Sequence, residues 1–131
     1  MISIRSALLS VALALALPLA ALAQDSPARK ELKRVDLGGV PGLEVVSSIT
    51  EYRPGDEVSA HLHHGVEAGY AVQGAMIQVP GKEPAMLPTG AAVLNLRDVM
   101  HGGFKIVGDT SLILFTVHVV DKGRPLYDVA K

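Results

Sequence analysis

The sequence contains no cysteine and no tryptophan, and only 4% of its 131 residues are aromatic. Without cysteine the chain cannot form disulfides, and it has no side chain that could carry the lipid of a lipoprotein. The stability of the folded chain must therefore come from a packed core, from oligomerisation or from a bound ion. Because aromatic residues are scarce, we expect aliphatic side chains to build most of the core.

An excess of charge of either sign is also missing. The sequence has 12 lysine and arginine residues against 13 aspartate and glutamate residues, which gives a formal net charge of −1. This balance gives no indication of a nucleic-acid partner or of binding to an anionic membrane surface. The length suits one domain with one hydrophobic core.

Residues 1–23 have the pattern of a secretory signal peptide. One positive charge, on Arg5, precedes a run of alanine, leucine and valine, and Ala21 and Ala23 complete a small-x-small cleavage site before Gln24. A transmembrane helix is the competing interpretation, but the unbroken apolar run is shorter than the roughly 20 residues that a bilayer requires. We therefore expect a periplasmic or secreted protein with no membrane attachment once the leader is removed.

Beyond the leader, turn sequences separate short apolar runs, a pattern typical of an all-β protein. Residues 24–41 begin with charged and polar residues and are predicted to form an N-terminal arm, in which residues 28–35 offer the only helical candidate. Short apolar runs rich in valine and isoleucine follow, separated by turn sequences such as RPGD and PGKEP. The runs cover residues 43–52, 57–63, 67–72, 75–79, 85–87, 91–96, 104–107 and 111–120. Their lengths and the lack of a helical period predict an all-β sandwich or barrel.

A dense group of histidines follows one of these turns. Between Gly55 and Gly74 the chain fits the pattern G-x5-H-x-H-x3-E-x6-G, with His61, His63 and Glu67 at the central positions. This segment resembles the first motif of the cupin superfamily at all five fixed positions. The resemblance implies a cupin double-stranded β-helix, which is a jelly-roll barrel. Within the superfamily, the chain resembles the small, secreted, single-domain (cupin_2-like) branch.

The second cupin motif is matched better in spacing than in residue identity. The motif G-x5-P-x-G-x2-H-x3-N begins at Gly90 and reaches His101 with the correct spacing. The expected proline, glycine and asparagine are replaced by Leu96, Asp98 and Lys105. On its own, this second match would be a weak indication.

The resemblance covers most of the chain beyond the leader. It assigns residues 42–123 to the cupin β-barrel and leaves residues 124–131 as a C-terminal tail. Small cupins often pair through edge strands, so the resemblance is also compatible with a homodimer, although no stretch of the sequence identifies the surface.

The spacing of the histidines predicts a metal site. Side chains two residues apart share one face of a strand, so His61 and His63 point in the same direction, and a chain that turns back brings Glu67 beside them. If His101 faces the same interior, three nitrogens and one carboxylate converge, which suits iron, manganese, nickel, copper or zinc rather than calcium or magnesium. The resemblance implies the same four residues, because they occupy the cupin ligand positions. A solvated histidine-rich turn is the alternative, but it leaves Glu67 and the second spacing unexplained.

Two further histidines are not assigned by the motifs. We interpret His64 as a loop or rim residue, with a place at the entrance or in the ligand set as the alternative. His118 lies in an apolar run whose alternation does not indicate which face is interior, so a surface position and a pocket position are both open.

The four-residue set predicts a metal-dependent enzyme that acts on a small organic molecule. The reaction would be of the dioxygenase type on a redox metal or an isomerase or lyase reaction, with Glu67 as the candidate catalytic base. A non-catalytic module that binds a small ligand or a metal, and a structural metal that ties strands together, are the alternatives. Because a site assembled after export would be filled by affinity, zinc or copper is favoured, with iron, manganese and nickel as further candidates.

Overall fold

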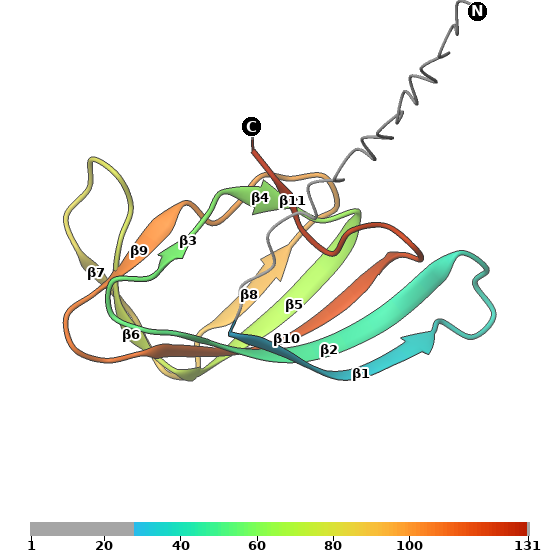
Figure 1. Ribbon diagram of the computed structural model, residues 1–131, viewed down its shortest axis with the longest axis horizontal. Helices are drawn as coiled ribbons and strands as arrows, with labels where there is room; N and C mark the ends of the chain where they lie inside the picture. The colour runs from blue at the N-terminus through green and yellow to red at the C-terminus, as the bar shows by residue number, and fades with distance from the viewer. Residues whose placement is uncertain (1–27, 131) are drawn as a thin grey trace, which may run out of the picture.

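The computed structural model describes residues 28–130, which form eleven strands (Figure 1). The strands are β1 (Arg29–Asp36), β2 (Leu43–Tyr52), β3 (Glu57–Val58), β4 (His61–Leu62), β5 (Gly65–Gln73), β6 (Ala75–Gln78), β7 (Ala85–Leu87), β8 (Ala92–Asn95), β9 (Phe104–Val107), β10 (Leu112–Asp121) and β11 (Asp128–Val129). Within these residues there is no helix that could cross a membrane.

The strands form two walls of a barrel. One wall is a five-stranded sheet in the order β1-β2-β10-β5-β8, and the other is a four-stranded sheet in the order β3-β9-β6-β7. A third, two-stranded sheet consists of the short strands β11 and β4, and β4 carries His61. Every pairing is antiparallel, and several join strands that are far apart in the sequence, such as β2 with β10 and β3 with β9. This is the architecture that the sequence predicts.

The predicted apolar runs correspond closely to the observed strands. The runs at 43–52, 85–87 and 104–107 coincide with β2, β7 and β9. The run at 57–63 is interrupted and forms the two short strands β3 and β4. Strand β3 belongs to the four-stranded sheet, whereas β4 pairs with β11, and both His61 and His63 are buried.

The barrel interior has an apolar end and a polar end. At the apolar end the buried core is largely aliphatic, as expected, and consists of Tyr52, Val58, Ala71, Ala75, Ile106 and Leu112. At the polar end, β2 and β10 alternate with regular period, so that their inward positions carry buried polar side chains. These buried polar residues are Glu44, Ser48, Thr50, Thr116 and His118, and they lie in the same wall as Glu67.

The predicted N-terminal arm differs from the expectation, because most of its described part is the edge strand β1. This strand pairs with β2 along its whole length and has one register shift between Glu31 and Lys33. The Arg29 guanidinium donates a hydrogen bond to the Ser48 hydroxyl at 2.7 Å, and Arg34 forms an ion pair with the buried Glu44. Pairing with β2 therefore replaces the helix that residues 28–35 could have formed, and the sheet begins before residue 42.

The predicted C-terminal tail also takes part in the fold. Residues 128 and 129 form β11 and pair with Leu62 and His61 of β4. The side chain of Tyr127 is buried and packs edge-on against His61 and His63, with ring centroids 4.9 and 5.0 Å apart. The predicted leader, residues 1–23, lies outside the described residues.

Candidate metal centre

The backbone brings the two motifs together at one end of the barrel. His61 lies on β4, Glu67 lies on β5, and His63 lies in the link between these strands. His101 is joined to His61 by an isolated antiparallel bridge, in which each backbone N–H donates to the other residue's carbonyl at 2.9 Å. The bridge fixes the second motif beside the first, although 40 positions of sequence separate the two histidines.

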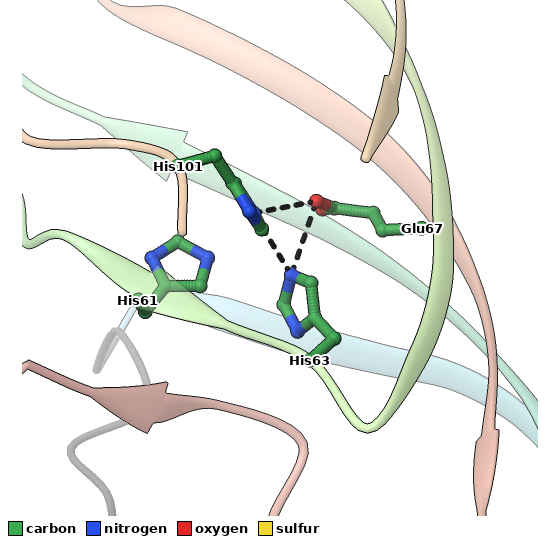
Figure 2. Close-up of side chains that lie close together, drawn as sticks. All are labelled: His61, His63, Glu67 and His101. Atoms are coloured by element: carbon green, nitrogen blue, oxygen red, sulfur yellow. Dashed lines mark hydrogen bonds and ion pairs between the residues drawn. The ribbon is translucent and has the colours of Figure 1, made fainter. Parts of the chain in front are cut away.

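The four predicted side chains converge as the spacing requires. Figure 2 shows His61, His63, Glu67 and His101 pointing toward one another, and one candidate ligand atom from each lies within 4.8 Å of the others. His63 Nε2 and His101 Nε2 are 3.1 Å apart, and they lie 3.1 and 3.3 Å from Glu67 Oε2. His61, His63 and Glu67 are buried, whereas the His101 side chain is 17% exposed. The predicted convergence is therefore present, with His101 on the accessible side.

Backbone carbonyls fix the tautomer of the three rings. Each ring directs its Nδ1 at a carbonyl oxygen, which belongs to Ser59 for His61 (2.7 Å), to Leu126 for His63 (2.6 Å) and to Val99 for His101 (3.0 Å). A carbonyl can only accept, so Nδ1 carries the proton and donates it. In each neutral ring the lone pair is then on Nε2, and two of these lone pairs meet at 3.1 Å beside a carboxylate. A cation bound among these acceptors would offset their mutual repulsion, so the donor set fits a metal ion.

The charges of the site follow from burial and from these contacts. Burial alone would raise the pKa of Glu67, but the adjacent imidazoles of His101, His118 and His63 hold that pKa well below its usual value. Burial lowers the pKa of His61 to about 4, so this ring is neutral at neutral pH. Burial would also lower the pKa of His101, but the contacts with Glu67 and with the Val99 carbonyl together outweigh burial and raise it. The centre therefore combines one fixed negative charge with imidazoles that can act as ligands.

Two residues that the sequence motifs do not identify lie next to the Glu67 carboxylate. Asn95 of β8 donates from Nδ2 to Oε2 at 2.7 Å, and His118 Nε2 of β10 lies 3.4 Å from Oε1. Both are direct cross-strand neighbours of Glu67, which β5 places between β8 and β10. The strand order would have identified them, but the sequence alone does not specify that order.

The two unassigned histidines occupy different environments. His118 is fully buried, and no hydrogen-bond partner of standard geometry is present for either of its ring nitrogens, so the interior interpretation holds. His64 lies at the rim, as expected. Its ring contacts Arg124, Asp98 and Asp128 at distances of 2.9 to 3.4 Å, and it is not part of the converging group.

A cavity of about 190 Å³ opens beside the converging side chains. His61, Glu67 and His101 form part of its wall, together with Asn95 and Gly102. Gly102 has a φ of 79°, and a Cβ at this position would lie 2.8 Å from the Ser59 carbonyl oxygen. A glycine is needed here because the chain passes directly over His61.

Comparisons with known proteins support the fold and leave the function open. No protein-family model matches the sequence, and no curated protein matches it. Among solved structures, a protein with a double-stranded β-helix domain from Klebsiella pneumoniae is 18% identical over 84% of this chain and 91% of its own, with a TM-score of 0.57. A cupin-2 domain from Rhodospirillum rubrum is 14% identical over 79% of this chain and 64% of its own, with a TM-score of 0.50.

Larger proteins with described activities share the same fold. The DMSP lyase DddQ from Ruegeria pomeroyi is 15% identical over 66% of this chain, with a TM-score of 0.52, and the polyketide cyclase RemF from Streptomyces resistomycificus is 20% identical over 66%, with the same score. The chain spans 43% of the length of the lyase and 61% of the length of the cyclase. These likenesses show the double-stranded β-helix fold and no more.

Proposed function

We propose that this chain, which has the cupin fold, is a metal-dependent enzyme that acts on a small organic molecule inside its barrel. His61, His63, Glu67 and His101 would hold one divalent transition ion. The observation that carries the proposal is the convergence of three Nε2 lone pairs and one carboxylate at the edge of a cavity. A set of three nitrogens and one oxygen suits zinc, copper, iron, manganese or nickel.

A bound ion would supply Lewis-acid chemistry, or redox chemistry if the metal has two accessible oxidation states. The chain's own groups favour proton transfer. Glu67 is ionised and lines the cavity, so its carboxylate is placed to accept a proton from a molecule bound there. Asn95 and His118 hold the two carboxylate oxygens and set their direction. We therefore propose an isomerase or lyase reaction, with a dioxygenase-type reaction as the second candidate. The fold shared with proteins described as lyases and a cyclase is consistent with this order.

A purely structural ion is less well supported. Structural metal sites are enclosed by four protein ligands, whereas catalytic sites keep an accessible position. Here the cavity reaches three of the four side chains, and His101 is exposed on that side. A non-catalytic module that captures a small ligand would use the same opening, and it is distinguished from an enzyme by the absence of turnover.

Metal content in matched histidine variants tests the proposal. His101→Ala removes one converging nitrogen, whereas His64→Ala removes a neighbouring rim histidine that contacts none of the four residues. We expect elemental analysis after dialysis to show about one ion per chain in the unaltered protein and in His64→Ala, and a large loss in His101→Ala. Equal retention in both variants would contradict the ligand assignment.

Turnover in a panel of small acids, enols and phenols by the metal-loaded protein would then distinguish an enzyme from a binding module.

We also propose that the protein is exported and acts in the periplasm or outside the cell, where it could form a homodimer. The support is the signal-peptide pattern of residues 1–23 and the resemblance to small cupins. Mass spectrometry of the protein from its native compartment should show a chain that begins at Gln24.

A further inference from the structure

The cavity beside the metal centre is polar at one end and apolar elsewhere. Its polar end is formed by the metal centre itself, through His61, Glu67 and His101, and by Asn95. Most of the remaining wall consists of apolar side chains from both sheets, which are Val58, Ile77, Leu87, Val93, Phe104 and Leu114. A bound molecule would therefore meet one polar site and, away from it, mainly hydrocarbon.

Charged groups are missing from the wall away from the centre. Among the described residues that line the cavity there is no lysine or arginine, and Glu67 is the only carboxylate. Two threonines and two tyrosines contribute the hydroxyl-bearing side chains of the wall, which are Thr50, Thr116, Tyr52 and Tyr127. An uncharged second oxygen can therefore be tolerated, but a second charge would be buried without a counter-ion, and an unpaired buried charge is strongly unfavourable.

The size of the cavity limits the body of the ligand. A cavity of roughly 150 Å³ lined by aliphatic and aromatic residues binds benzene in an engineered protein. At about 190 Å³, this cavity holds a body of similar size together with a small head group. Contact with the apolar wall stabilises such a body in proportion to the apolar area removed from water.

The charge at the polar end specifies the head group. A divalent ion and one glutamate leave a net positive charge in a site that is largely shielded from water, and this charge favours one anionic oxygen. We infer that the cavity selects small molecules with a single anionic oxygen head, such as a carboxylate, an enolate or a phenolate, on an uncharged apolar body. This inference rests on the proposed metal centre, because the ion anchors the head group.

Three carboxylates of related structure test the inference by calorimetric titration of the zinc-loaded protein, after one zinc per chain has been verified by elemental analysis. Benzoate has one head and an apolar body, acetate has the head alone, and terephthalate adds a second carboxylate at the far end of the same ring. We expect benzoate to bind at least tenfold more tightly than either acetate or terephthalate. Terephthalate binding as tightly as benzoate, acetate binding as tightly as benzoate, or no binding of any of the three would overturn the inference.

Two leucines of opposite orientation provide the matched variants. Leu87 lines the cavity, whereas Leu94 is 65% exposed on the outer face of β8. We expect Leu87→Ala to weaken benzoate binding by about tenfold and to leave acetate binding unchanged, and Leu94→Ala to change neither. If Leu87→Ala does not fold, Ile77→Val removes a single methylene from the same wall and should weaken benzoate about fourfold. Equal effects of Leu87→Ala and Leu94→Ala would contradict the assigned cavity.

The proposed metal centre and the inferred ligand class would fail with different experimental results. If the protein takes up no zinc or other transition ion, the proposed function is wrong, and the inferred ligand class is wrong as well. If the protein takes up one ion but does not discriminate among the three carboxylates, the metal centre stands and only the ligand class is wrong.

Discussion

At the scale of single residues, the carboxylate of Glu67 has four polar side chains close to it. It accepts a hydrogen bond from Asn95, lies between His63 and His101, and has His118 beside its other oxygen. Groups that orient a metal ligand in this way commonly change metal affinity by about 10- to 100-fold when they are removed. The buried position of His118 thus has a functional interpretation in addition to a packing one.

Variants of His118 should therefore change metal affinity from a position outside the ligand set. His118→Phe keeps the approximate volume of the ring but removes the nitrogen that lies 3.4 Å from Glu67 Oε1, so we expect metal affinity to fall about tenfold or more. His118→Gln can place an N–H near the position of Nε2 and should recover part of the loss. Competition with a chromophoric chelator measures both affinities.

Thermal unfolding of the metal-free variants is the control for this comparison. If His118→Phe and His118→Gln bind metal equally well, or if their affinities follow only the stability of the metal-free protein, His118 has a packing role alone.

Residue geometry also explains why the second motif is preserved in spacing and not in identity. Asp98 occupies the position of the expected glycine and has a φ of 59°, which is the left-handed region that aspartate adopts more readily than most residues. The turn before His101 therefore keeps its shape without glycine. The spacing to His101 was a reliable guide because it reflects this backbone path, whereas the identities at the intervening positions can vary.

At the scale of secondary-structure elements, the candidate metal ligands could be predicted from the sequence. The residues that contact Glu67 from the neighbouring strands could not. Alternation along a strand places His61 and His63 on one side, which is a local property. The contacts of Asn95 and His118 with Glu67 depend on β5 lying between β8 and β10, which is a non-local arrangement. Strand β1 was missed for a related reason, since charged residues are common on edge strands and make such a segment look like a polar arm.

Strand β1 gives a prediction for pH dependence. Two hydrogen bonds from Arg34 lower the pKa of Glu31 below its ordinary value of 4.5. A carboxyl group with a lowered pKa in the folded state stabilises that state above its ordinary pKa, and this contribution is lost as the pH falls through the lowered value. We expect Glu31→Gln to lower the melting temperature slightly at pH 7 and to have progressively less effect as the pH falls below 4.5.

The size of this effect should be small because Glu31 and Arg34 are both well exposed. Melting curves of the unaltered protein and of Glu31→Gln across this pH range provide the measurement. A difference between the two that grows as the pH falls would show that the Arg34 contact does not stabilise the pairing of β1.

At the scale of the whole molecule, stability and metal binding should be coupled. Because the folded barrel gathers ligands that are separated in the unfolded chain, an ion bound only to the folded state adds about 2.7 kcal/mol when its free concentration is a hundredfold above Kd. For a domain of this size we expect a chelator to lower the melting temperature by several degrees. Re-addition of the metal should restore it, and identical melting of both forms would show that the barrel does not depend on the ion.

The identity of the metal should depend on where the chain folds. The leader has the single positive charge Arg5 and lacks a twin-arginine pair, so export by the general secretory route in an unfolded state is expected. The site would then fill outside the cytoplasm, where affinity favours copper and zinc over manganese and iron. Elemental analysis of protein from the native compartment should find mainly zinc or copper. Protein produced in the cytoplasm without residues 1–23 should instead contain whichever ion is abundant there, such as iron or nickel, and a native preparation rich in manganese or iron would contradict the prediction.

The hydrogen bond from His63 Nδ1 to the Leu126 carbonyl also has a consequence for the order of events during synthesis. A ribosome makes the chain from its N-terminus, so all four converging side chains exist before residue 126 has been added. Until that carbonyl arrives, the most deeply buried of the rings has no acceptor to hold its proton on Nδ1, and its metal-facing nitrogen is not fixed. If the centre binds an ion, we therefore expect tight capture only after nearly the whole barrel has been made.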